Sequence, residues 1–161
     1  MLMRRVFAGI VGGAVGTVFM TMAMKKMHQQ LPRKDRYPLP PRRVTMELVE
    51  KSGLEPPARE TDRKTLTRVT HYAFGTGMGA VFSLIAPRTR WAPLVAALPF
   101  GLAVWAGSYL GWLPALGLHP PATQESASRN ALMIASHFVW AGTLGATVAG
   151  LAPARTPSKQ P

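Results

Sequence analysis

Two histidines lie inside long uncharged stretches of this sequence, and their side chains are the ones there best able to do chemistry. His71 lies three residues past Arg68, and His137 lies seven residues past Asn130. An ionisable side chain within an apolar segment is rare and is usually functional. A pair of imidazoles is able to ligate haem or a metal ion, or to relay protons. The simpler interpretation is that each neutral imidazole hydrogen-bonds a neighbouring helix.

Ser136 and Thr143 are the hydroxyl side chains that would serve as hydrogen-bond partners under either interpretation. On a helical rise of ~1.5 Å per residue the two histidines differ in depth by about 6 Å, which is unfavourable for two axial haem ligands. The apolar stretches hold no carboxylate and no further histidine pair to complete a metal site. We therefore predict no metal and no cofactor, and two neutral histidines, each bonded to a carbonyl or hydroxyl of a neighbouring helix.

No motif for catalysis accompanies the histidines. The sequence has no cysteine, which excludes disulfides, cysteine-ligated zinc, iron–sulfur clusters and thiol catalysis. It also lacks GxSxG, Walker and HExxH motifs. The absence of Asp and Glu from the apolar stretches weighs against a proton- or ion-coupled transporter. We expect that the protein is not an enzyme.

Four long apolar stretches must position these side chains. Residues 91–124 contain no Asp, Glu, Lys or Arg, which is enough chain for a helix across the ~30 Å apolar core of a bilayer. Backbone polar groups in lipid must be satisfied internally, so helices are predicted. The sequence predicts an all-α integral membrane protein with a disordered tail at 153–161. Its membrane domain, 1–152, is a close-packed bundle of four transmembrane helices, at about 6–25, 68–86, 91–113 and 128–151.

Local signals predict where these helices begin and bend. Thr61 and Thr123 have the side chain of a good N-cap, and they precede the second and fourth helices. Pro120 and Pro121 stop any helix that would run on from the third. Pro99 lies inside the third helix and is predicted to kink it.

Most of the positive charge falls between the first two apolar stretches. The net charge is +12, and twelve of the Lys and Arg residues lie within 25–68, where prolines interrupt regular structure. We predict a long basic, proline-rich loop at 26–65. One short helix fits inside this loop, beginning at Pro41 and ending before Gly53.

The charge of this loop bears on its partners and on orientation. Arg42, Arg43 and Lys51 belong to the short helix, which we predict to lie on the membrane and contact anionic lipid headgroups. A solvated connector is the equally supported alternative. The loop has no recognisable nucleic-acid reader fold, so we expect no nucleic-acid partner. The bias of positive charge predicts that this loop faces the cytoplasm and that both termini face outward.

Small residues recur at helical spacing along the apolar stretches. Glycines four residues apart lie on one helix face and allow close approach of another helix backbone in lipid. We predict that such faces of the first, second and fourth helices meet within the bundle. The glycines predicted to serve in helix packing are Gly9, Gly13, Gly75, Gly79, Gly107, Gly111, Gly142 and Gly145.

Several short motifs occur in order along the chain. They are PLPPR at Pro38–Arg42, His71 with Gly75 and Phe82, GLHPP at Gly117–Pro121, and SHFVW at Ser136–Trp140. In this order and spacing the chain resembles the YagU-like family of small bacterial inner-membrane proteins, a family of unknown function. The resemblance implies a polytopic protein of the bacterial inner membrane, and it implies no reaction.

The expected function follows from these observations. We interpret the chain as a small multi-pass inner-membrane protein with a non-catalytic structural or interaction role. Its expected partners are the lipid bilayer, and a second copy of the chain or another membrane protein is compatible with the glycine-rich faces. Two alternatives stay open. One is a small transporter or channel with a path past His71 and His137, and the other is a haem-binding electron carrier.

Overall fold

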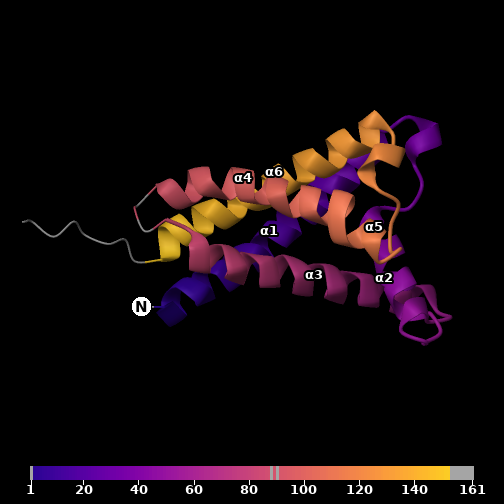
Figure 1. Ribbon diagram of the computed structural model, residues 1–161, viewed down its shortest axis with the longest axis horizontal. Coiled ribbons are helices and arrows are strands. Elements are labelled where there is room, and N and C mark those ends of the chain that lie inside the picture. The colour runs from indigo at the N-terminus through magenta and orange to yellow at the C-terminus, as the bar shows by residue number, and fades with distance from the viewer. Residues whose placement is uncertain (1, 88, 90, 153–161) are drawn as a thin grey trace, which may run out of the picture.

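A computed structural model of the protein describes residues 2–87, 89 and 91–152 (Figure 1). Within this part of the chain the regular structure is all helical, as the sequence predicts, and no strand occurs. The predicted disordered tail at 153–161 lies outside the described residues.

Four long helices and several short ones make up the fold. The long helices are α1 (Leu2–Gln30), α3 (Glu60–Ile85), α4 (Ala92–Ala106) and α6 (Ala127–Leu151). The short elements are η1 (Arg33–Asp35), α2 (Pro40–Lys51), the π-helix η2 (Gly107–Trp112), α5 (Leu113–Ala115) and η3 (Ala122–Gln124).

The long helices run side by side along the longest axis of the molecule (Figure 1). α1 and α6 pack along each other, α3 packs on α1, and α4 packs on α6, whereas α3 and α4 touch only slightly. α2 packs on α3. Figure 1 shows α2 and α5 together at the end of the bundle opposite the N-terminus. The fold therefore leaves α3 and α4 separated, with short elements gathered at one end.

In the part of the chain that the structure describes, three helical segments are long and apolar enough to cross a membrane: Leu2–Gln30, Ala92–Ala115 and Ala127–Leu151. These segments indicate a membrane-embedded protein. The fourth span predicted at 68–86 falls within α3, which is not among the three. The first turns of α3 carry charged side chains, including Glu60 and Asp62, and its apolar part is correspondingly short.

The predicted loop at 26–65 is a loop over only part of its length, which corrects the sequence analysis. α1 continues to Gln30, and α2 and the start of α3 occupy much of the remainder. The short helix expected between the prolines is present as α2, and it ends ahead of Gly53, which has φ +74°. α2 packs against α3, where the Oγ1 atoms of Thr45 and Thr70 lie 2.7 Å apart. Contact with α3 therefore orders a segment that its prolines alone would leave irregular.

Two local predictions about helix ends are wrong. α3 begins at Glu60 with Arg59 at the N-cap, so Thr61 lies inside the helix. The N-cap of α6 is Ser126, whose Oγ accepts from the Arg129 N–H at 3.4 Å, because the 3₁₀ turn η3 already contains Thr123. Pro99 lies within α4, which continues past it, so the kink predicted there stays a prediction; the chain departs from α geometry later, in η2. There Gly111 has the non-helical angles φ −114° and ψ −105°.

Glycines on α1 allow two neighbouring helices to approach closely. A Cβ added to Gly9 would collide with the carbonyl oxygen of Gly79 on α3, and one added to Gly13 would lie 3.1 Å from the Gly79 Cα. Gly12 and Gly16 face α6 instead, and a Cβ on Gly16 would lie 2.9 Å from Trp140. The two interleaved glycine pairs of α1 thus serve two different neighbours.

The other glycines expected to pack fall into two groups. A Cβ on Gly145 would lie 2.8 Å from the Ala97 Cβ, so this residue lies at the α4–α6 contact. Gly107, Gly111 and Gly142 are not at a helix–helix contact, since a Cβ on any of them would meet nothing within 4 Å in the described structure. Gly107 and Gly111 belong to η2, whose altered turn removes the one-face spacing that an α-helix would give them.

A buried arginine ties the start of α1 to the end of α3. Arg5 is only 6% exposed. Its guanidinium donates to the carbonyl oxygens of Ser83, at 3.1 Å, and of Ala86, at 2.6 Å. The last carbonyls of a helix lack intrahelical donors and carry partial negative charge, so a cation is favourable there. No local sequence pattern indicates this contact, which joins residues about eighty positions apart.

Candidate functional site

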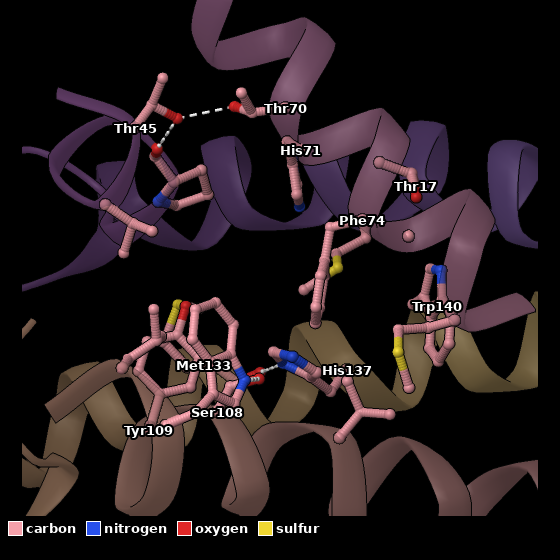
Figure 2. Close-up of a pocket in the computed structure, with 18 of the residues that line it drawn as sticks. Thr17, Thr45, Thr70, His71, Phe74, Ser108, Tyr109, Met133, His137 and Trp140 are labelled. Carbon is pink, nitrogen blue, oxygen red and sulfur yellow. Dashed lines mark hydrogen bonds between the residues drawn. The ribbon is translucent and has the colours of Figure 1, made fainter. Parts of the chain in front are cut away.

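A cavity of about 200 Å³ lies inside the bundle (Figure 2). Its walls come from α1, α3, the end of α4, η2 and α6, and α2 covers one side. The cavity is partly open rather than sealed. Its apolar lining comes from Met20, Pro41, Val44, Leu48, Phe74, Met78, Val104, Trp112, Leu113, Met133 and Trp140.

Most hydroxyl groups of the lining are already paired. Thr45 Oγ1 donates to the Pro41 carbonyl and pairs with Thr70. Thr17 donates to the Gly13 carbonyl at 2.8 Å. Ser108 Oγ accepts from Trp112 Nε1 at 3.2 Å. These groups are therefore satisfied by the protein itself.

His137 has one nitrogen committed and one available. Its Nδ1 lies 2.7 Å from the Met133 carbonyl oxygen. A carbonyl only accepts, so Nδ1 carries the proton, and Nε2 of the neutral ring is a bare acceptor. The carbonyl belongs to the same helix, α6, whereas the sequence analysis expected one on a neighbouring helix. The reason is that the carbonyl four residues earlier lies within reach of the ring.

His71 lies on the other side of the same cavity. Figure 2 shows its ring pointing from α3 into the cavity, toward the wall that carries His137. Among the described residues it has no hydrogen-bond partner, although the sequence analysis expected one. The structure therefore places both histidines at one cavity. Their estimated difference in depth of about 6 Å counted only against two axial haem ligands, and it stays a prediction.

Tyr109 is a site residue that the sequence analysis did not identify. It comes from η2 and lines the cavity, and its ring forms a T-shaped pair with the His137 ring, with centroids 6.1 Å apart. Its hydroxyl has no hydrogen-bond partner in the described part of the chain. A π-helix turn changes which side chains face inward, and such turns are frequent at functional sites. In the sequence, the only indication of an unusual turn around this tyrosine is the pair of glycines that flank it, Gly107 and Gly111.

Ser136 and Thr143 do not belong to the cavity. Ser136 is fully buried and donates to the Leu132 carbonyl at 2.7 Å. Thr143 is half-buried and donates to the Val139 carbonyl at 2.9 Å. Both groups bond back to their own helix, one turn earlier. They face other directions around α6 than His137 does, so neither assists it.

The unpartnered groups of the site border open space. In the described structure, Trp105 Nε1 is the one sealed side-chain nitrogen or oxygen without a hydrogen-bond partner. The free groups of His71, Tyr109 and His137 are therefore not packed against protein. Among the described residues, no Asp, Glu, Lys or Arg lines the cavity. The site consequently offers neutral donors and acceptors in an apolar setting and no ionic partner for a charged ligand.

A second polar cluster, which we call the Arg129 clamp, holds the segment after α1 against the start of α6. Arg129 is 3% exposed, and its Nε donates to Glu125 Oε2 at 2.9 Å. Its terminal nitrogens donate to the carbonyls of Asp35, Tyr37 and Pro38 at 3.0, 3.0 and 3.1 Å. The guanidinium also lies 3.6 Å from the centre of the Tyr37 ring. Because every group has a partner, the clamp is structural.

Ser128 and His119 are the further residues that complete the clamp. Ser128 donates to Asp35 Oδ2 at 2.5 Å, which lowers the pKa of that carboxyl. The Tyr37 hydroxyl donates to Glu125, and burial together with this bond raises the pKa of the tyrosine. His119 Nδ1 lies 2.7 Å from the Pro120 carbonyl, and its Nε2 lies 3.8 Å from Glu125 Oε1. The clamp thus contains one histidine in a buried setting.

Acidification is expected to destabilise the protein through His119. Burial lowers the pKa of His119 below its ordinary value of 6.5. The unfolded chain therefore takes up this proton first, and the stabilisation is present above pH 6.5 and is lost as the pH falls toward the folded-state pKa. Thermal unfolding in detergent measured from pH 7.5 to 5.5 should show a falling midpoint. His119→Asn keeps a donor for Pro120 and should flatten this slope; equal slopes would contradict the assignment.

The basic residues of α2 have different surroundings. Arg42 donates two hydrogen bonds to Glu60, at 2.5 and 2.6 Å, and this pairing lowers the pKa of Glu60 to about 2. Arg42 therefore joins α2 to the first turn of α3. Arg43 and Lys51 are exposed. These two side chains are available to a partner outside the protein. The Arg42–Glu60 ion pair is exposed, and exposed ion pairs add little stability.

Comparison with known proteins identifies a family. A family model described as "Protein of unknown function (DUF1440)" matches residues 37–146. The match includes α2, α3, α4, η2 and most of α6, and so every wall of the cavity except α1, together with its cover. It carries neither the YagU-like name nor a bacterial origin. No curated protein and no solved structure matches the chain.

Proposed function

The family model matches more than half of the chain, so the chain belongs to the family of unknown function DUF1440. We propose that the protein is a non-catalytic, four-span membrane protein that binds a small uncharged molecule inside its bundle. The cavity beside His71 and His137 is the single observation that carries this proposal. Following the YagU-like resemblance, we assign it to a bacterial inner membrane.

The size and lining of the cavity define the ligand in general terms. An engineered apolar cavity of about 150 Å³ binds benzene, so about 200 Å³ accommodates one ring with small substituents. The lining is mostly apolar, and its free polar groups belong to His71, Tyr109 and His137. Pockets of this composition hold a ligand by apolar contact and orient it by a few hydrogen bonds.

A binding role fits the site better than catalysis or haem binding. Ser108 Oγ accepts from Trp112, and no hydrogen bond joins a hydroxyl of the lining to either histidine in the described structure, so no activated nucleophile is present there. A haem macrocycle is several times larger than benzene, which is too large for about 200 Å³. These observations favour a binding protein over the electron carrier.

Saturable binding of a small aromatic ligand tests the proposal. Bromobenzene should quench the fluorescence of Trp112 and Trp140, which line the cavity, when titrated into the protein in nanodiscs. Val104→Phe fills the cavity and should weaken binding at least 10-fold. Val95→Phe on the same helix is the control, since Val95 is exposed. Identical quenching curves for the two variants would show that the ligand only partitions into lipid.

α3 is proposed as the fourth span. It runs beside α1 along the bundle (Figure 1), and Val81, Leu84 and Ile85 leave apolar surface exposed on its second half. The chain has no cysteine, so single cysteines report sidedness without background. Ser52→Cys and Thr89→Cys, which flank α3, should react with an impermeant maleimide from opposite sides, with Ser52→Cys on the cytoplasmic side. Labelling of both cysteines from the same side would show that α3 does not cross the membrane.

The exposed basic residues of α2 suggest a second contact with the membrane. Arg43 and Lys51 belong to α2, which lies at the end of the bundle where the short elements gather (Figure 1). Each exposed cation near an anionic surface contributes on the order of 1 kcal/mol. We include contact of these two side chains with anionic lipid headgroups in the proposed function, with a second copy or another membrane protein as a further partner and no role for nucleic acid.

A further inference from the structure

The cavity offers hydrogen-bonding groups on opposite walls. His71 projects from α3, and Tyr109 and His137 belong to the facing wall, formed by η2 and α6 (Figure 2). A neutral His71 has one donor and one acceptor nitrogen, the Tyr109 hydroxyl donates, and His137 Nε2 accepts. A flat molecule between these walls with an oxygen on each of two opposite sides would meet a hydrogen-bonding group at both ends.

We propose that the ligand of this cavity is a para-quinone or the corresponding quinol, the lipid-soluble class that carries two oxygens across one six-membered ring. This inference rests on the proposed binding function. In the oxidised form the two carbonyl oxygens accept from His71 and from the Tyr109 hydroxyl. In the reduced form a ring hydroxyl donates to Nε2 of His137, whose proton is fixed on Nδ1 by the Met133 carbonyl.

The charge of the lining selects against other amphipathic ligands. A fatty acid or phospholipid would place its anionic group beside no cation, and an amine would meet no carboxylate, because the lining formed by the described residues holds neither. A buried charge without a partner is strongly unfavourable. A simple alkane would leave Tyr109 and His71 without partners, whereas a quinone supplies an acceptor to each.

The shape of the lining suits a substituted ring with a tail. Phe74 and Trp112 lie with ring centroids 5.9 Å apart, and Trp140 also lines the space. Met20 and Met78 supply flexible, polarisable side chains that adapt to ring substituents. The volume of about 200 Å³ holds the ring alone. Because the cavity is partly open, an alkyl or isoprenoid tail extends from it past the weakly touching helices α3 and α4.

Matched ligands separate this inference from the proposed function. The full chain in nanodiscs would be titrated with decylubiquinone and with decylbenzene, which has a similar tail and no oxygen, and binding followed by tryptophan fluorescence. Decylubiquinone should bind at least 10-fold more tightly. If decylbenzene binds equally well, the quinone inference fails and the binding function stands. If neither ligand binds saturably, both fail.

Variants then test the hydrogen bonds. Tyr109→Phe and His71→Phe should each weaken decylubiquinone binding about 10-fold, the usual effect of one lost buried hydrogen bond, and leave decylbenzene unchanged. Tyr72→Phe is the matched control, because Tyr72 is the neighbour of His71 on α3 but does not line the cavity. Melting temperatures establish that each variant is folded. Equal quinone affinity in Tyr72→Phe, Tyr109→Phe and His71→Phe would overturn the inference.

Discussion

Replacement of Arg129 by methionine is expected to lower the free energy of unfolding by about 3–5 kcal/mol, the usual cost of breaking a buried ion pair from one side. The variant leaves Glu125, whose side chain is 8% exposed, without its cation. It also leaves the carbonyls of Asp35, Tyr37 and Pro38 without the donors that the guanidinium supplies. Unfolding in mixed micelles with increasing sodium dodecyl sulfate measures the loss.

The matched control for this prediction is Arg33→Met. Arg33 lies in the same segment after α1 but is exposed, so its loss should change stability by no more than about 0.5 kcal/mol. Arg129→Lys tests the geometry further, because one ammonium cannot donate in the directions of all four acceptors at once. Equal stability of Arg129→Met and Arg33→Met would mean that the clamp does not hold the two segments together.

The clamp also marks the limit of what the sequence could predict. Uncharged stretches of bilayer length identify helices from local pattern, which is why the positions of α1, α4 and α6 followed from the sequence. Pairs such as Arg129 with the Asp35 carbonyl join residues 94 positions apart. The spacing of apolar residues does not predict such a long-range pair. From the sequence, Arg129 therefore counted only as part of the positive charge.

The candidate site was predictable by residue type and not by geometry. His71 and His137 could be selected because a polar ring in an apolar stretch is conspicuous. That both line one cavity depends on how the helices pack and on the π-helix η2, which places Tyr109 beside His137. A depth estimate based on straight helices contains neither feature. Ser136 and Thr143 are close to His137 in sequence but face other directions around α6. A helical wheel does not show which of these directions faces the cavity, because that depends on the neighbouring helices.

The largest contrast between neighbouring substitutions is expected on α3, where Gly79→Ala should destabilise and Gly77→Ala should stabilise. A Cβ on Gly79 would collide with the Gly9 carbonyl oxygen and lie 2.7 Å from the Gly13 Cα. Both are backbone atoms of α1, so relief requires the helices to separate. Overpacking of this kind typically costs about 1–3 kcal/mol. It would also weaken the nearby bond from Trp140 Nε1 to the Gly13 carbonyl.

Gly77 differs from Gly79 only in what it faces. A Cβ there would meet nothing within 4 Å among the described residues, so the substitution gains the higher helix propensity of alanine, about 0.5–1 kcal/mol. Both variants make the same change two residues apart on one helix, so their effects on the unfolded chain largely cancel in the comparison. Unfolding midpoints in detergent that shift in opposite directions establish the close contact of α1 with α3. Two upward shifts would mean that α1 and α3 are farther apart than their glycines allow, and the wall of the cavity that carries His71 would then lie elsewhere.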